Sequence, residues 1–297
     1  MDNKETIIVG APQRQKTMNL PDGRRLAWSE WGPVDGIPVL FCTGAAMSSW
    51  LGFGENVLQN LGLRLIAIDR PGLGFSAPHP TKTLSSWVED IRNFLEVQKL
   101  HNVLTVGFSQ GAPFAFALAA QNLVKVLAIV SGQDELTHPN ILPLVHLDVK
   151  NMIAAIKEDA VGFEQHFSQI ATASGLWQLI IGMSAEKDRL LYESEAFSQA
   201  FRKALEEGFS QGPRGYARDL VNTFSPWPIK LEEISIPVNL WYGGLDTSTV
   251  HSPDFGATLA NRLSLAERIF EPNEGGSILW TKSGEILLKL KSHLLIT

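Results

Sequence analysis

Cysteine is nearly absent from this sequence of 297 residues, which contains only Cys42. A single thiol cannot form a disulfide within the chain, and it excludes a metal site built from several cysteines. Because Cys42 ends an apolar run, we expect a packing residue of a strand rather than a reactive group. Internal repeats and low-complexity segments are also lacking.

Long apolar runs and an excess of positive charge are absent as well. No stretch reaches the roughly 20 apolar residues that cross a membrane, and residues 1–17 contain no apolar segment of the signal-peptide type. The formal net charge of -6 disfavours nucleic acid and anionic membranes as partners. We therefore expect a cytoplasmic protein that needs no metal ion or other cofactor and whose partner is a small-molecule substrate or ligand.

Strand and helix patterns alternate along most of the chain after a loose leader, residues 1–15. Short apolar runs bounded by turn residues predict strands, and amphipathic runs predict helices. This alternation indicates an α/β fold with a mostly parallel, twisted sheet flanked by helices. The predicted strands are 16–20, 25–31, 38–42, 63–68, 103–106, 124–130, 236–242 and 267–271, and the predicted helices are 50–61, 84–98, 110–121, 252–263 and 281–295.

The pattern changes between residues 133 and 227. This segment predicts helices near 145–157, 163–174 and 190–207, contains no convincing strand, and is too long for a loop. We therefore predict an α/β core formed by residues 1–132 and 228–297. The helical segment 133–227 would be a cap inserted over the carboxyl edge of the sheet.

The chemistry begins at Gly107-Phe108-Ser109-Gln110-Gly111, between an apolar run and an Ala-rich helical pattern. A strand that turns sharply into a helix has room only for very small residues two before and two after the turning residue. This requirement explains both glycines. Ser109 would have a strained backbone and an exposed side chain, at a helix N-terminus that favours negative charge. The pattern predicts a nucleophilic serine.

Three further motifs surround this one in a fixed order. Thr43-Gly44 follows strand 38–42, Asp-Arg-Pro-Gly-x-Gly-x-Ser follows strand 63–68 at residues 69–76, and Gly-x-x-Asp ends at Asp246. Together the four motifs make the chain closely similar to the α/β-hydrolase fold, in the branch of small capped esterases and proline-iminopeptidase-like enzymes. The family usually has His-Gly where Thr43-Gly44 stands. The fold alone does not fix the reaction, because it hosts many chemistries.

The resemblance implies a role for each matching position. Ser109 would be the nucleophile, and its hydroxyl attacks only when an imidazole, oriented by a carboxylate, removes the proton. Asp246 stands where the family places that carboxylate, and Asp134, after strand 124–130, is the alternative acid. The oxyanion hole would consist of the backbone N–H groups of Ala45 and Gln110.

Histidine is lacking where the family has its base. The family places it in a Gly-His pair after the last strand, and here that position is Gly276. The triad is therefore broken, or Gly276 is itself a substitution, or the base comes from elsewhere. His251, close to Asp246 in the sequence, is the candidate replacement. The alternative interpretation of His251 is a polar residue at the start of a helix, without a catalytic role. For the other histidines we expect surface or packing roles: His79, His101, His138, His146, His166 and His293.

Three classes of function fit this pattern. The first is a serine hydrolase acting on a small, largely apolar ester, amide or lactone, slowed by the missing histidine because losing a triad member costs several orders of magnitude in rate. The second is a hydrolase-fold protein that binds a small ligand with little or no turnover, and a third, a lyase or other non-hydrolytic enzyme, uses the same scaffold. An apolar pocket would be lined by Trp50, Phe53, Trp177, Met183 and Trp227.

Overall fold

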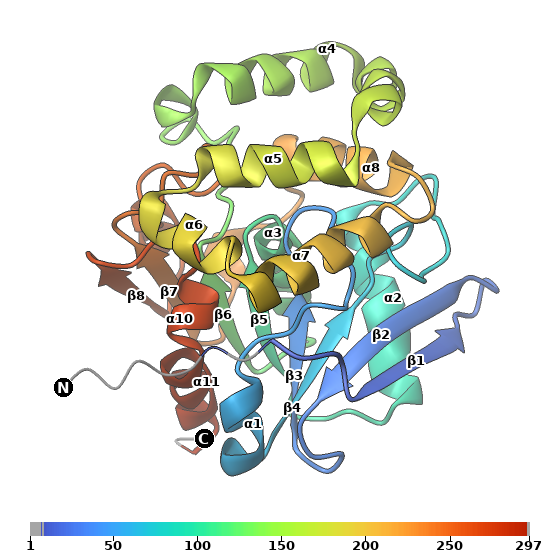
Figure 1. Ribbon diagram of the computed structural model, residues 1–297, viewed down its shortest axis with the longest axis vertical. Coiled ribbons are helices and arrows are strands. Elements are labelled where there is room, and N and C mark those ends of the chain that lie inside the picture. Colours follow the sequence, from blue (N-terminus) through green and yellow to red (C-terminus); the bar gives the residue numbers. More distant parts are fainter. Residues whose placement is uncertain (1–6, 8, 296–297) are drawn as a thin grey trace.

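One twisted sheet forms the centre of the computed structural model, which describes residue 7 and residues 9–295 (Figure 1). Its eight strands lie in the order β1-β2-β4-β3-β5-β6-β7-β8. The pairs β1–β2 and β2–β4 are antiparallel and all others are parallel, so the predicted mostly parallel sheet is confirmed. The strands are β1 (Arg14–Asn19), β2 (Arg25–Trp31), β3 (Ile37–Cys42), β4 (Leu63–Ile68), β5 (Leu104–Phe108), β6 (Val126–Val130), β7 (Val238–Gly243) and β8 (Ala266–Glu271).

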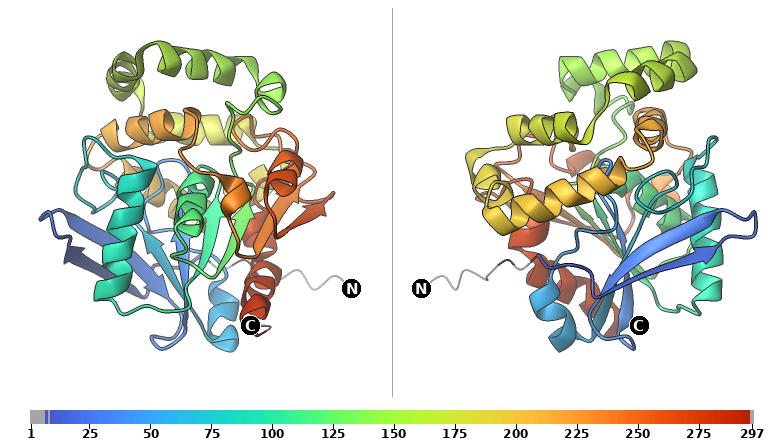
Figure 2. Two further views of the ribbon diagram at one scale, coloured as in Figure 1. Left: turned by 180° about the vertical axis from the view of Figure 1, so that it is seen from behind. Right: turned by 45° about the vertical axis from the view of Figure 1, so that its right-hand side comes forward.

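Helices cover both faces of this sheet, and alternate residues of each central strand face opposite layers. Val39 and Phe41 of β3 pack in the same core as Leu287, whereas Leu40 and Cys42 pack with Phe114. Burial raises the pKa of the Cys42 thiol to about 12. The first face carries α1 (Glu55–Leu61), α10 (Ile278–Thr281) and α11 (Ser283–Ser292), and the second carries α2 (Leu84–Val97), α3 (Gly111–Ala120) and α9 (Ala257–Arg262) (Figure 2).

The segment between β6 and β7 forms a layer of helices over the carboxyl ends of the strands (Figure 1). We call it the helical layer: α4 (Leu147–Ile170), α5 (Ala173–Met183), α6 (Glu186–Tyr192), α7 (Glu195–Gly208) and α8 (Arg214–Phe224). Two predicted helices are here one run, α4, kinked at Asp159. The Asp159 carboxylate accepts a hydrogen bond from Gly162 N and so begins the second half as a cap does. Helix α8 was not predicted.

Several helix boundaries differ from the prediction, for local reasons. The helix expected from residue 50 begins at Glu55, because Gly54 has a left-handed backbone. The helix expected from residue 252 begins only at Ala257, because Asp254 accepts hydrogen bonds from the first backbone N–H groups of α9. The helix expected over 281–295 is divided among α10, α11 and a short 3₁₀ turn. The predicted leader lies partly outside the described residues, and β1 begins within it.

The turn from β5 into α3 shows why the sequence has glycine on both sides of Ser109. Ser109 has a φ of 51°, in the left-handed region. A Cβ on Gly107 would lie 2.8 Å from Ala115 Cβ, and one on Gly111 would overlap the backbone carbonyl of Cys42. Only glycine therefore lets the strand, the turn and the helix approach so closely.

We predict that Gly111→Ala destabilises the protein by about 1–3 kcal/mol, because the added methyl group must displace backbone atoms of β3. Urea unfolding followed by circular dichroism measures the change. Gly182→Ala is the matched control, since a Cβ there meets no atom within 4 Å and alanine favours a helix. Equal stability of both variants and the wild type would contradict the prediction.

Candidate active site

Ser109 lies at the carboxyl end of β5, beneath the helical layer. Hydrogen bonds from neighbouring segments hold its strained backbone: its N–H donates to Val130 O at 3.2 Å, and its carbonyl accepts from Ala112 N and Gln133 N. The expected exposure of its side chain is wrong: residues of α5 and α6 close the cavity beside Ser109, which is only 7% exposed. The turn therefore fixes where the hydroxyl points.

His251 connects Ser109 to Asp246. Its Nε2 lies 2.9 Å from Ser109 Oγ, and its Nδ1 lies 2.7 Å from Asp246 Oδ2. A neutral imidazole protonated at Nδ1 satisfies both contacts, because it donates to the carboxylate and accepts from the hydroxyl. The structure thus brings together the three side chains that the sequence nominated as nucleophile, replacement base and acid.

The loop between β7 and α9 gives His251 this reach. Asp246 Oδ1 accepts a hydrogen bond from Ser248 N at 3.0 Å, which orients the carboxylate. Ser252 N donates to Gly132 O, which anchors the chain directly after the imidazole. The ring edge of His251 also faces the Phe108 ring, with 6.3 Å between centroids. Because α9 begins five residues after Ser252, the loop stays long enough for the ring to contact both partners.

Gly276 faces the same carboxylate from the other side. A Cβ at this position would lie 2.9 Å from Asp246 Oδ1, so a side chain could enter only if Asp246 moved. The backbone is held in place, because Gly276 N and Ser277 N each donate at 2.9 Å to the carboxylate of Asp188 on α6. Sequence reasoning missed Asp188, which no motif marks.

The two N–H groups expected to form an oxyanion hole lie near Ser109. Within the described residues, neither Ala45 N nor Gln110 N donates to a protein acceptor. Ala45 lines the cavity beside Ser109, and the next residue, Ala46, has a φ of 51° that bends the loop. Two backbone donors are therefore open to a developing negative charge.

Asp134, the alternative acid, does not contact the imidazole. Its carboxylate accepts a hydrogen bond from Ser252 Oγ at 2.9 Å, and this hydroxyl also lies 2.9 Å from Asp254 Oδ1. Burial, with a smaller contribution from the nearby charge of Asp254, raises the pKa of Asp134 to about 7. Of the seven histidines, all within the described residues, only His251 bonds to Ser109; His293, for example, bonds to Asn239.

The cavity beside Ser109 has a volume of about 80 Å³, and most of its surface is apolar. Of the five residues predicted to line it, only Met183 does so. The other four predictions are wrong, because their rings are used in packing: Phe53 contacts Phe41, Trp227 contacts Phe116, Trp177 contacts Phe201, and Trp50 stacks with Lys203. Side chains that line the cavity include Met47, Phe108, Leu176, Ile180, Tyr192, Phe201, Tyr216 and Val250.

Two further findings concern the described residues as a set. Among residue 7 and residues 9–295, no helix has both the length and the apolar character needed to cross a membrane. Within the same residues, no group of three or more His, Cys, Asp and Glu side chains is arranged to hold a metal ion.

This fold and this arrangement define a known class of proteins. The sequence model of the family described as alpha/beta hydrolase fold matches residues 37–252. The match covers more than half of the chain, and the chain therefore belongs to the α/β-hydrolase fold family. The fold class expected from the four sequence motifs is confirmed.

Two curated relatives match parts of the chain. The non-heme chloroperoxidase of Streptomyces lividans is 32% identical over 98 residues, which are 32% of this chain and 35% of that protein. The proline iminopeptidase of Arabidopsis thaliana is 27% identical over 132 residues, which are 43% of this chain and 35% of that protein. The chain thus spans about a third of the length of these relatives.

Solved structures match over nearly the whole chain. A hydrolase from Pseudomonas aeruginosa has a TM-score of 0.70 at 18% identity, covering 94% of this chain and 98% of its own. An esterase from Thermogutta terrifontis has a TM-score of 0.68 at 16% identity, covering 97% of this chain and 98% of its own. At identities this low, the structural similarity shows the shared fold alone.

The raised pKa of Asp134 predicts a pH-dependent stability. An aspartate in the unfolded chain loses its proton near pH 3.8, whereas folded Asp134 keeps it to about pH 7. The folded state therefore binds the additional proton between these values, and stability falls as the pH rises from about 4 to about 7. Asp134→Asn should lessen this fall without abolishing it, because burial also raises the pKa of Asp69, to about 6.

Urea unfolding at several pH values measures this dependence. Asp35→Asn, at an exposed carboxylate, is the control and should keep the wild-type slope. A slope for Asp134→Asn equal to that of the wild type would show that Asp134 does not titrate in this range.

Proposed function

We propose that this protein is a serine hydrolase that cleaves small, largely apolar carboxylic esters, lactones or amides. Ser109 is the nucleophile, His251 the general base and acid, and Asp246 the carboxylate that orients the imidazole. The observation that carries the proposal is the continuous chain of hydrogen bonds from Ser109 Oγ through His251 to Asp246.

Acylation follows from these contacts. His251 Nε2, 2.9 Å from Ser109 Oγ, takes the hydroxyl proton as the oxygen attacks the substrate carbonyl carbon. The carbonyl π electrons move to the carbonyl oxygen, whose negative charge is stabilised by the N–H groups of Ala45 and Gln110. Asp246 stabilises the imidazolium through Nδ1–H. His251 then gives its proton to the leaving oxygen or nitrogen, and the C–O or C–N bond breaks to leave an acyl-serine.

Deacylation repeats these steps with water. His251 removes a proton from a water molecule, whose oxygen attacks the acyl carbon, and the same two N–H groups stabilise the second tetrahedral intermediate. The bond to Ser109 Oγ breaks, the oxygen regains its proton from His251, and the carboxylic acid leaves. No other residue needs to change its protonation state.

The shape of the cavity supports a small substrate. A volume of about 80 Å³, with an apolar surface, fits a short acyl group better than a long chain or a charged one. We further propose that residues 133–227 act as a cap, because Leu176, Ile180 and Met183 of α5 and Tyr192 of α6 complete the cavity wall.

The alternative of a binding protein without turnover rested on the missing histidine at position 276. The contact between His251 and Ser109 supplies a base from a different position, so we infer that Gly276 does not imply impaired catalysis. The same contact supports hydrolysis over a lyase reaction, because it activates the serine for attack.

Removal of a triad side chain tests the mechanism. We expect His251→Ala and Asp246→Asn to lower kcat for p-nitrophenyl butyrate by about 10³–10⁴-fold. Ser109→Ala sets the background and should also abolish labelling by a fluorophosphonate probe. His146→Ala, at an exposed residue, is the control. Wild-type turnover by a folded His251→Ala variant would show that His251 is not the base.

Position 276 gives an independent test of the relocated base. Gly276→His restores the residue usual in the family, yet we expect it to lower turnover, because its Cβ would press on Asp246 Oδ1. Gly276→Ala should have a smaller effect of the same sign. A rise in kcat for Gly276→His would contradict the proposal that His251 serves as the base.

A further inference from the structure

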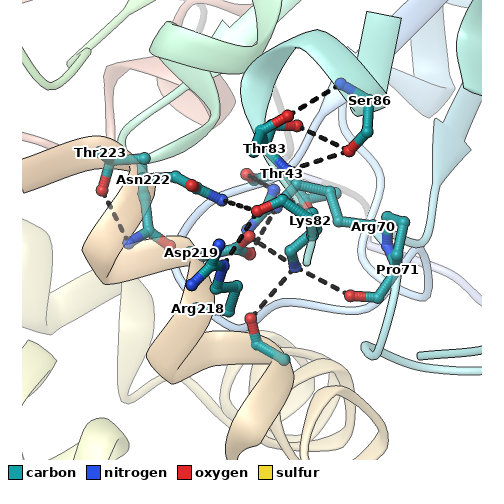
Figure 3. Close-up of polar contacts among 12 residues, drawn as sticks. Thr43, Arg70, Pro71, Lys82, Thr83, Ser86, Arg218, Asp219, Asn222 and Thr223 are labelled. Carbon is teal, nitrogen blue, oxygen red and sulfur yellow. Dashed lines mark hydrogen bonds and ion pairs between the residues drawn. The ribbon is translucent and has the colours of Figure 1, made fainter. Parts of the chain in front are cut away.

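A buried ion cluster contacts the loop that contains Ala45, through the carbonyls of Thr43 and Gly44. It comprises Arg70 from the loop after β4, Lys82 just before α2, and Asp219 of α8 (Figure 3). The three side chains are 0%, 1% and 0% exposed. Burying three charges costs free energy that their mutual attraction repays only with good geometry. A cluster of this kind beside a catalytic loop suggests a role beyond stability.

Arg70 distributes its hydrogen bonds between two parts of the molecule. Its Nε donates to Asp219 Oδ2 at 2.8 Å, which connects it to the helical layer. Its Nη1 donates to Thr43 O at 2.6 Å and its Nη2 to Gly44 O at 2.9 Å. The guanidinium also stacks on the Phe114 ring, with Cζ 4.7 Å from the centroid. The planar group therefore has little freedom to rotate.

The bond to Gly44 O determines the direction of an oxyanion donor. Gly44 C=O and Ala45 N–H belong to one planar trans peptide group, in which the two bonds point in opposite directions. Because Arg70 binds this carbonyl, Ala45 N–H must point away from Arg70, and Ala45 lines the cavity beside Ser109. A rotation of this peptide would break the bond to Arg70 and remove the donor at the same time.

Helix α8 also contacts the second donor residue. Thr223 lies one turn beyond Asp219, on the same face of the helix. Its Oγ1 accepts a weak hydrogen bond from Gln110 Nε2 at 3.4 Å, and its carbonyl accepts one from Gln133 Nε2 at 2.8 Å. One face of α8 thus contacts Gln110 directly and, through Arg70, the carbonyl of Gly44 that precedes Ala45.

Lys82 fixes the position of α8 relative to the loop that contains Arg70. Its Nζ lies 2.6 Å from Asp219 Oδ1 and donates to Pro71 O and Gly215 O. Burial lowers the pKa of Lys82, and the charge of Asp219 opposes this shift. The backbone of Gly215 also packs directly on that of Gly72. The position of α8, and through it that of Arg70, is therefore firmly defined.

We propose that Arg70 is a positioning residue for the oxyanion hole, and that Asp219 on α8 holds it in place. The inference rests on the proposed hydrolase function. It makes α8 part of the catalytic apparatus, although neither Arg70 nor Asp219 is among the residues that line the cavity beside Ser109. Loss of the two carbonyl bonds should weaken binding of the transition state more than binding of the substrate.

Three variants separate this role from simple stability. Arg70→Lys keeps a positive charge, but a single ammonium on a shorter side chain replaces the planar group whose three separate nitrogens bond to Asp219, Thr43 O and Gly44 O. Asp219→Asn keeps a polar partner for Arg70. Arg218→Gln is the matched control, because Arg218 joins α8 to the core through Lys82 O and to α4 through Glu164, without a hydrogen bond to Thr43 or Gly44. Thermal unfolding of each variant shows how much of any loss is due to unfolded protein.

The first readout compares turnover with the affinity for a butyl boronic acid. Boron forms a bond to Ser109 Oγ as the proton moves to His251, and a boron-bound oxygen occupies the oxyanion hole. For Arg70→Lys we expect kcat to fall about 10–100-fold, approaching the effect of losing one donor. Boronate affinity should fall by a similar factor, with KM nearly unchanged. Asp219→Asn should show a smaller decrease of the same kind, and Arg218→Gln none.

The second readout does not require turnover. Boronate binding should shift the amide proton of Ala45 in an ¹H–¹⁵N spectrum of the wild type, and shift it less in Arg70→Lys. A folded Arg70→Lys variant with the kcat and boronate affinity of the wild type would overturn the inference. A boronate-induced Ala45 shift of equal size in the wild type and in Arg70→Lys would also overturn it. A wild-type protein that binds boronate with the Ala45 shift but hydrolyses no ester would instead contradict the proposed function.

Discussion

The hydrogen bond between His251 Nδ1 and Asp246 Oδ2 constrains the rest of the site, because both residues belong to the single loop after β7. Their positions are five residues apart, so the loop must double back to bring the imidazole against the carboxylate. It can do so because α9 begins only at Ala257, where Asp254 accepts hydrogen bonds from the first N–H groups of the helix. The bond from Ser252 N to Gly132 O then fixes the ring within reach of Ser109, 142 residues away in the sequence.

The loop after β8 is organised differently as a result. With the imidazole supplied from the β7 loop, position 276 has no side chain to contribute, and its backbone packs on Asp246 instead. Asp188 holds this backbone through Gly276 N and Ser277 N. The carboxylate of Asp188 on α6 thus holds the loop after β8 next to Asp246.

The sequence predicted the sheet and the turn at Ser109 well, because both depend on short-range patterns. Apolar runs define the buried strands, and the glycines at 107 and 111 are required by contacts that any strand–turn–helix of this type must make. His251 was nominated only by its closeness to Asp246, since the reach of a loop depends on where the next helix begins. The cavity wall was predicted poorly: aromatic content says nothing about which ring faces inward, and Tyr192 and Tyr216 lie on helices whose boundaries were not predicted. Asp188 and Asp219 could not be identified, because their partners are distant in sequence.

The ion cluster at α8 also bears on how molecules enter and leave the cavity. Lifting this end of the helical layer would separate Asp219 from Arg70 and Lys82 and leave three charges without partners, a state that is strongly unfavourable in a protein interior. Other helices of the layer are attached to the core elsewhere: the buried Asp188 of α6 accepts hydrogen bonds from Gly276 N and Ser277 N, and Glu207 of α7 accepts one from Ser48 Oγ. Any opening of the cavity that keeps the three charges of the ion cluster paired must therefore leave α8 in place.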